Sequence, residues 1–187
     1  MNWPITDWLD FMEAHPGLVR YLKVAALGSY GTGPLKMAKG LAEIINVPLY
    51  SHIGEFQNQS LDPLVYEIFN ISQAGDIITH IYHDNGSPIL DEHGKVLPIV
   101  RDAERRGVIF DIGFGGFNFG WDLAEKAFAP DLRPHVISSD LQQFNVLGPV
   151  FSLAHIMGMH LHLGMTVPEV IETVTIAPAR ALSLDDR

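Results

Sequence analysis

The sequence predicts a parallel α/β protein in which strands and helices alternate along the chain. Short apolar segments recur at a nearly constant spacing, segments with helical periodicity lie between them, and glycine or proline marks most transitions. The strand candidates begin 28 to 31 residues apart, at 19–26, 48–53, 76–82, 107–112 and 135–139. Because one strand with its following helix occupies roughly 30 residues, the chain is predicted to contain five successive βα units.

Helix predictions fill the intervals between the strand candidates. Apolar residues follow helical spacing over 35–45, 64–71, 98–106, 118–129 and 149–163. Thr166 and Glu169 form a capping box that opens a last helix. The segment 84–97 interrupts the rhythm, and its two turn-forming pairs predict a small hairpin or loop after the third strand. Loops inserted after barrel strands often cover the active site.

Five units are too few to close an eight-stranded barrel. We therefore expect residues 1–187 to be a single domain that forms part of a barrel, as a fragment or a chain completed by a partner. A doubly wound open sheet is the alternative fold. No glycine-rich dinucleotide or phosphate-binding motif follows any strand candidate, so this alternative lacks its usual nucleotide fingerprint.

The composition narrows the class of function. A net charge of −10 argues against nucleic-acid partners and anionic membrane surfaces, since both attract clustered Lys and Arg. The absence of cysteine excludes disulfides and zinc–thiolate sites and accords with a cytoplasmic protein. Nine histidines remain, so a transition metal would need imidazole and carboxylate ligands. We expect a small-molecule substrate, and a homo-oligomer is compatible with the sequence.

Candidate metal ligands stand at the carboxyl ends of the strand candidates, where parallel α/β proteins place their active sites. His52 ends the second strand, His80 lies near the end of the third, Asp140 follows the fifth, and Lys23 lies within the first. Imidazole and carboxylate suit a divalent ion such as zinc, which activates a bound water. Each residue alone is unspecific, but their recurrence at one period indicates a site. His83 competes with His80, which we favour because it ends the strand.

The pair His160 and His162 resembles a two-histidine metal motif but lies in a predicted helix. Residues two apart on a helix point about 200° apart, so the two rings cannot face one ion. We expect both to be packing or solvent-exposed histidines.

The chain resembles the deacetylase-like branch of the amidohydrolase superfamily, some members of which are labelled dihydroorotase-like. The resemblance is carried in order by 22–24, 34–39, 49–54, 75–80, 89–96, 110–113, 137–140, 145–150 and 177–182, including the motif Leu-Tyr-Ser-His-Ile-Gly at 49–54. It implies a partial TIM (β/α)8 barrel of the metal-dependent hydrolase type, about strands 4–8, without the first strands and the family's β-sandwich.

The resemblance also implies roles for single residues. Lys23 would be carboxylated and would bridge two divalent metal ions, for which zinc is the expected metal. His52 and His80 would be ligands from neighbouring strands, and Asp140 would be both a ligand and the proton shuttle. The family's upstream His-x-His pair has no counterpart before Lys23, where His15 is the sole histidine. Departures from the family pattern at Phe114, Gln142 and 25–27 affect the expected substrate rather than the ligands.

Three hypotheses of function follow. The first is a metal-dependent hydrolase that cleaves an amide or ester, such as an N-acyl amino acid or an acylated hydroxy acid, through a metal-activated hydroxide. The second is a cyclic amide hydrolase of the dihydroorotase type, ranked lower because no arginine dedicated to a substrate carboxylate can be identified. The third is an inactive truncated homologue that scaffolds a partner.

Overall fold

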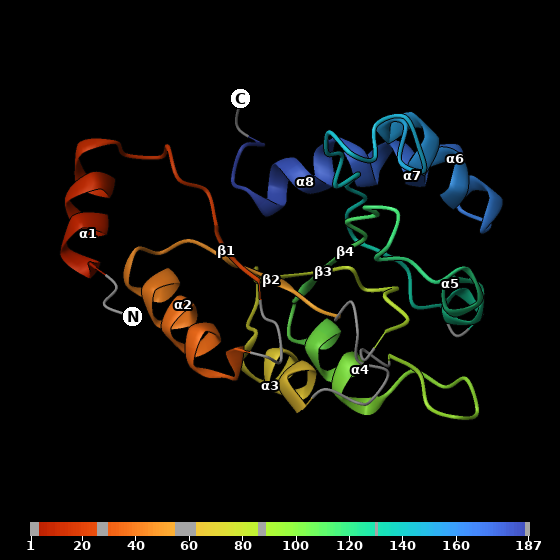
Figure 1. Ribbon diagram of the computed structural model, residues 1–187, viewed down its shortest axis with the longest axis horizontal. Coiled ribbons are helices and arrows are strands. Elements are labelled where there is room, and N and C mark those ends of the chain that lie inside the picture. The colour runs from red at the N-terminus through yellow and green to blue at the C-terminus, as the bar shows by residue number, and fades with distance from the viewer. Residues whose placement is uncertain (1–3, 26–29, 55–62, 86–88, 130, 186–187) are drawn as a thin grey trace.

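The computed structural model describes residues 4–25, 30–54, 63–85, 89–129 and 131–185 (Figure 1). Its centre is a parallel sheet with the strand order β1-β2-β3-β4. The strands are β1 (Leu22–Val24), β2 (Leu49–His52), β3 (Ile77–Thr79) and β4 (Ile109–Asp111). Each strand thus pairs with its neighbour in sequence. A doubly wound sheet reverses its strand order at a switch point, so this sequential order supports the barrel prediction.

Helices connect the strands as the apolar spacing predicts. They are α1 (Ile5–Ala14), α2 (Gly33–Ile44), α3 (Pro63–Ile71), α4 (Pro98–Arg105), α5 (Trp121–Phe128), α6 (Leu153–His162), α7 (Val167–Val174) and α8 (Ile176–Ala181). Two helices begin later than predicted. α5 follows a glycine-rich turn, and α6 begins only after Ser152, whose hydroxyl accepts a hydrogen bond from the His155 amide.

One predicted strand is wrong. The segment 135–139 forms only an isolated parallel bridge between Val136 and Asp111. Its carbonyls instead accept hydrogen bonds from the turn that follows β4, with Phe114 N donating to Ser138 O at 3.2 Å. Gly113 has a left-handed φ of 49°, which bends the partner segment away from strand geometry and prevents a regular ladder.

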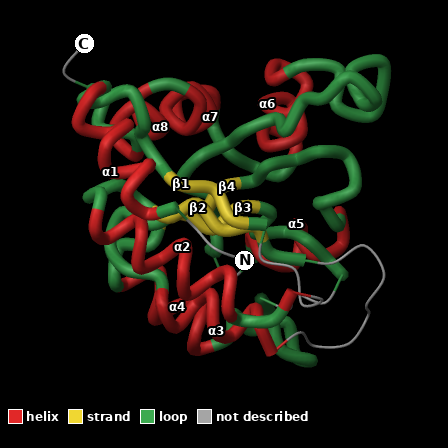
Figure 2. Tube along the Cα trace, turned by 60° about the vertical axis from the view of Figure 1, so that its left-hand side comes forward, coloured by secondary structure: helices red, strands yellow, loops and turns green. Residues whose placement is uncertain are grey.

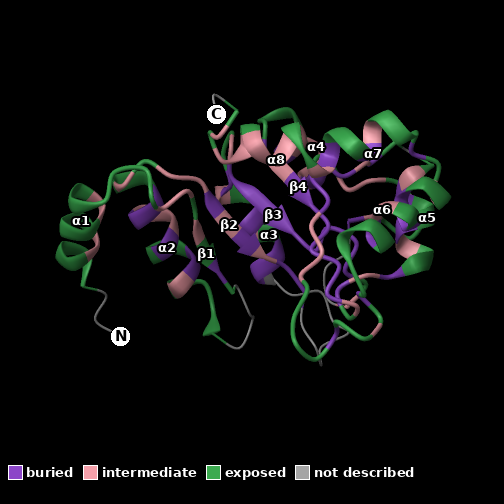
Figure 3. Cartoon of the chain, turned by 90° about the horizontal axis from the view of Figure 1, so that it is seen from above, coloured by how far each residue is buried: buried purple, intermediate pink, exposed green. Residues whose placement is uncertain are grey.

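The predicted hairpin in 84–97 is confirmed where it lies within the described residues. Leu90 and Val96 form an antiparallel bridge, and the Asp91 amide donates to Lys95 O at 2.8 Å. The first predicted turn, at 85–86, lies partly outside the described residues, which exclude 86–88. Helix α1 lies before the first strand candidate and was not predicted. None of its side chains is buried, and it lies to one side of the sheet (Figure 3).

The two faces of the sheet differ in chemistry. Helices α2, α3 and α4 lie together on one side of the strands (Figure 2), and Leu49, Ile78 and Phe110 are fully buried in the core. Alternation along each strand turns the intervening residues to the other face. The strand register places His52, Thr79 and Asp111 side by side in one row of that face. This second face therefore carries the polar residues near the carboxyl ends of the strands.

No helix among the described residues is both long enough and apolar enough to cross a bilayer.

Candidate metal centre

His52 and His80 form the centre of the candidate site. Their rings meet edge to face with centroids 4.4 Å apart. The Nε2 of His52 lies 3.1 Å from Gly54 O, and the Nδ1 of His80 lies 2.7 Å from Gly113 O. A carbonyl can only accept, so each of these nitrogens carries the proton. The lone pairs then sit on Nδ1 of His52 and Nε2 of His80, and these are the nitrogens able to bind a metal.

Burial keeps both rings neutral. Desolvation lowers the pKa of His52 to about 4, and the Gly54 carbonyl opposes this only in part. Desolvation lowers the pKa of His80 further, to about 2; repulsion from His52 when that ring is protonated, and from the charged Lys23, adds to the effect. A neutral imidazole is the form that binds a metal ion, so the site is prepared to accept one near neutral pH.

His80 owes its position to an unusual backbone and to a glycine. Its φ of 66° is left-handed, which is uncommon for a residue with a side chain. A Cβ at Gly113 would lie 2.3 Å from Thr79 Oγ1 and 2.7 Å from His80 Nδ1, so only glycine permits this approach. The competing residue, His83, is also buried, and its Nδ1 accepts a hydrogen bond from the Asn85 amide at 3.0 Å.

Asp140 and Lys23 complete the predicted set. Together with His80 they border one cavity of about 290 Å³, and Tyr21 and Tyr50 also line it. The side chain of Lys23 is exposed on the edge strand, yet its Nζ lies 3.9 Å over the ring of Tyr50. Desolvation lowers the pKa of Lys23, while the negative charges of Asp111 and Asp140 partly restore it.

Asp111 is a buried carboxylate that sequence reasoning missed. Its Oδ2 accepts hydrogen bonds from Thr79 Oγ1 at 2.6 Å, from Ser138 Oγ at 2.8 Å and from the hydroxyl of Tyr50. Burial raises the pKa of Asp111, and the three hydroxyl donors oppose that rise. The sequence feature that could have identified Asp111 is an acidic residue near the end of an apolar strand candidate, at a position that faces the same side of the sheet as His52. Asp111 and its three hydroxyl donors thus connect four chain segments next to the cavity.

The donors match a divalent ion in kind, since the imidazole of His80 and the carboxylate of Asp140 border one cavity and the neutral His52 ring contacts His80. Within the ranges that the structure describes, however, no group of three His, Asp or Glu side chains is close enough together to hold a metal. The structure therefore brings His52 and His80 into contact, and places Asp140 and Lys23 around the same cavity, without closing a three-ligand set. Their assignment as metal ligands stays a prediction.

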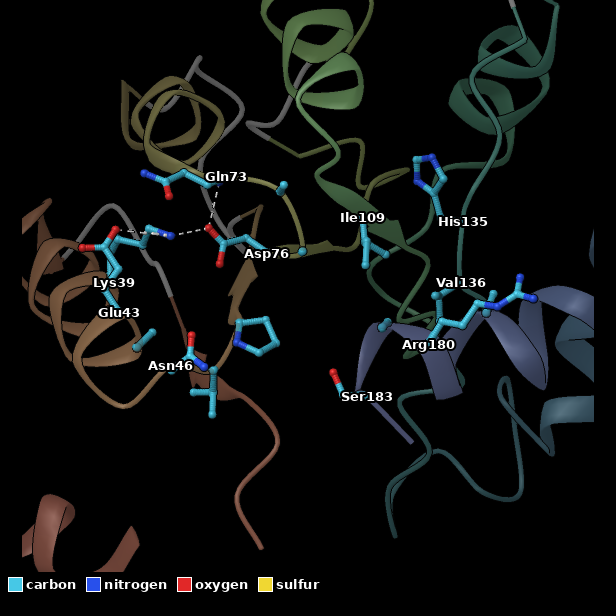
Figure 4. A pocket seen from close by; sticks show the side chains of 17 residues that line it. Lys39, Glu43, Asn46, Gln73, Asp76, Ile109, His135, Val136, Arg180 and Ser183 are labelled. Carbon is cyan, nitrogen blue, oxygen red and sulfur yellow. Dashed lines mark hydrogen bonds and ion pairs between the residues drawn. The ribbon is translucent and has the colours of Figure 1, made fainter. Parts of the chain in front are cut away.

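A larger cavity, of about 620 Å³, opens at the opposite end of the strands between α2 and α8 (Figure 4). Its charged residues already have partners, because Asp76 accepts hydrogen bonds from Lys39 Nζ at 2.6 Å and from the amides of Leu49 and Gln73 at 2.8 Å. In barrel enzymes this amino-terminal end serves stability rather than catalysis. Size alone therefore does not make this cavity the functional site.

Comparisons with known proteins show what the chain is similar to in sequence and in fold. No protein-family model matches the chain. It is 34% identical over 159 residues to a deacetylase of Agrobacterium fabrum, covering 84% of this chain and 38% of that protein. It is 33% identical to a deacetylase of Enterococcus faecalis, covering 91% of this chain and 46% of the relative.

Solved structures give the same result at the level of the fold. A dihydroorotase structure superposes with a TM-score of 0.85 and 34% identity, over 98% of this chain and 49% of that one. The chain corresponds to part of an amidohydrolase-superfamily barrel. An adenine deaminase structure matches this amidohydrolase section equally well, with a TM-score of 0.85 and 31% identity over 96% of this chain and 50% of that one. The section spans about half the length of the relatives it matches, or less.

Proposed function

We propose that the chain supplies the strand-end residues of a metal-dependent hydrolase that cleaves an amide or ester. The observation that carries this proposal is the contact between two neutral imidazoles, His52 and His80, beside a cavity that Lys23 and Asp140 border. The deacetylase names of the curated relatives support a substrate with an acyl group, such as an N-acyl amino acid or an acylated hydroxy acid.

The ligand roles follow from the ring tautomers. His52 would bind through Nδ1 and His80 through Nε2, because the other nitrogen of each ring donates to a backbone carbonyl. Asp140 would add a carboxylate, and Lys23, once carboxylated, would bridge two zinc ions. A bound divalent ion lowers the pKa of a coordinated water and polarises a carbonyl group.

The proton transfers belong to Asp140. Its carboxylate accepts a proton from the attacking water as the water oxygen bonds to the carbonyl carbon of the substrate. Asp140 then donates that proton to the leaving nitrogen or oxygen as the bond to the acyl carbon breaks. The products are a carboxylic acid and a free amine or alcohol, so atoms and charge balance.

A second candidate is hydrolysis of a cyclic amide. The observation in its favour is the match to the dihydroorotase structure. The two candidates use the same strand-end residues and differ in substrate. A parallel assay on N-acetyl amino acids and on cyclic amides such as dihydroorotate separates them, because the preferred substrate class shows the higher kcat/KM.

The test of the proposed function is hydrolysis of N-acetyl amino acids by the zinc-loaded protein and by its Asp140→Asn variant. We expect the variant to lose at least about a hundred-fold in kcat, since general acid–base transfer contributes on that order. Asp122→Asn, which changes an exposed acid on α5, is the matched control and should keep full activity. Equal activity of wild type and Asp140→Asn would rule out the role assigned to Asp140.

The absence of cysteine supports a cytoplasmic location for this proposed enzyme.

A further inference from the structure

We propose that three amide side chains, Asn118, Gln142 and Asn145, act as positioning residues that hold Asp140 in one orientation. The inference rests on the proposed function only in that it assigns a purpose to the orientation of Asp140. We call these three residues the amide cradle. They come from two loops at the carboxyl end of the sheet, 113–119 and 140–150, and their contacts converge on one aspartate.

Asn145 fixes the backbone of Asp140. Asp140 has a φ of 48°, in the left-handed region that residues with side chains rarely adopt. The Nδ2 of Asn145 donates to Asp140 O at 3.1 Å and to Gly115 O at 3.0 Å. Its Oδ1 accepts a hydrogen bond from the backbone N–H of Gln142 at 2.7 Å. Asn145 is fully buried, so these bonds form in a low-dielectric setting. One side chain therefore joins both loops and supports the strained residue.

The other two amides hold the carboxylate itself. Gln142 Nε2 lies 3.3 Å from Asp140 Oδ1, and Asn118 Nδ2 lies 3.4 Å from Asp140 Oδ2, so each oxygen has one donor. Two donors on opposite oxygens restrict rotation of the carboxylate group. Asn118 is itself buried, and its Oδ1 has no partner among the described residues, so the bond from its Nδ2 to Asp140 is what its side chain contributes here.

Gly115 allows the loops to approach this closely. Its φ is 55°, and a Cβ there would lie 2.7 Å from both Asn118 Nδ2 and Asp140 Oδ2. The backbone thus passes directly beside the contact between the carboxylate and its donor. A glycine at this position, a left-handed aspartate and a fully bonded buried asparagine together form a built support rather than a chance contact.

Three variants test the amide cradle. Asn145→Ala removes the link between the loops, Gln142→Ala removes one donor to the carboxylate from an exposed position, and Gln143→Ala changes the neighbouring exposed glutamine as the matched control. The first measurement is hydrogen–deuterium exchange of the loops 113–119 and 140–150 in the intact chain, which needs no substrate. We expect Asn145→Ala to increase exchange at least about ten-fold in both loops, and Gln143→Ala to leave it unchanged.

The second measurement is hydrolysis of N-acetyl amino acids, with kcat and KM determined separately for each folded variant. We expect Gln142→Ala to lower kcat about five-fold with KM unchanged, because the lost bond orients the proton-transfer group and not the substrate. Normal exchange in Asn145→Ala, or a wild-type kcat in Gln142→Ala, would overturn the inference. An inactive wild type would instead refute the proposed function, while the exchange result would still decide whether the amide cradle exists.

Discussion

Asp111 holds the polar interior of the sheet together through three hydroxyl donors. Replacing it with alanine leaves the hydroxyls of Tyr50, Thr79 and Ser138 without their shared acceptor. Unsatisfied buried polar groups cost about 1–3 kcal/mol each, so we expect Asp111→Ala to lower the free energy of unfolding by at least about 2 kcal/mol. Urea unfolding measures this loss.

The matched control for that experiment is Asp122→Ala, at an exposed position of α5. It should change the free energy of unfolding by less than about 0.5 kcal/mol. A loss no larger in Asp111→Ala than in the control would show that the hydroxyls find other partners, and that Asp111 is not the centre of this network.

His160 makes stability depend on pH. It is fully buried in α6, and desolvation lowers its pKa below the usual value of 6.5. Its unfolded form therefore binds a proton at a pH where the folded form does not, so stability is present above pH 6.5 and falls as the pH drops below that value. The loss is at most about 1.4 kcal/mol per pH unit for this one group.

Removing His160 should reduce that acid sensitivity. We expect the unfolding free energy of His160→Leu to fall less steeply between pH 7 and pH 5 than that of the wild type, in urea titrations of the metal-free protein. His162→Leu, at an exposed position on the same helix, is the control and should keep the wild-type slope. A slope unchanged by His160→Leu would mean that its proton affinity does not differ between the folded and unfolded states.

Sequence reasoning found the strand-end residues but not their supports. His52, His80 and Asp140 stand at or just after the carboxyl ends of apolar strand candidates that recur at a fixed period, a pattern visible without coordinates. Asp111 and Asn145 were missed because their partners are distant in the sequence. The hydroxyl partners of Asp111 lie 27 to 61 residues away, and Gly115, whose carbonyl Asn145 binds, lies 30 residues away. Hydroxyl and amide residues are common on surfaces, so their convergence becomes visible only when the chain is folded.

At the scale of elements, local chemistry predicts most helices and strands but not the irregular ones. Four strand candidates contain observed strands, because apolar and β-branched residues mark buried parallel strands. The segment 135–139 also contains β-branched residues, Val136 and Ile137, but it pairs with a turn that contains left-handed glycines, and strand formation depends on the partner as much as on the segment. Helix α1 carries apolar residues at helical spacing, Ile5, Trp8, Leu9 and Met12, but none of its side chains is buried, and it was not predicted.

The capping box of α7 is an element whose prediction is confirmed in detail. Thr166 Oγ1 accepts from the Glu169 amide, and the Glu169 carboxylate accepts from the Thr166 amide at 2.6 Å. We expect Thr166→Ala to lower the unfolding free energy by about 1 kcal/mol, as loss of an N-cap usually does. Thr6→Ala, on exposed α1, is the control for urea unfolding. Equal stability of Thr166→Ala and wild type would show that the cap contributes nothing.

At the scale of the whole molecule, the sheet is a section of a barrel wall. Its strands follow one another in order. The superposition on the dihydroorotase structure covers 98% of this chain but only 49% of the dihydroorotase chain. The face that carries His52 and Asp111 is the one that alternation turns away from the core packed around α2–α4. A polar inner face with residues gathered at the carboxyl ends is the arrangement in which barrel enzymes place their chemistry.

The proposed function requires that these strand-end residues bind a divalent metal ion. The most direct test is the zinc content of the purified chain after zinc loading and exhaustive dialysis, measured by elemental analysis for the wild type and for His52→Ala. We expect near-stoichiometric zinc in the wild type and a clear loss in His52→Ala, with both proteins folded by circular dichroism. A wild type without bound zinc, or a His52→Ala variant that retains it fully, would show that these residues do not form the proposed metal site.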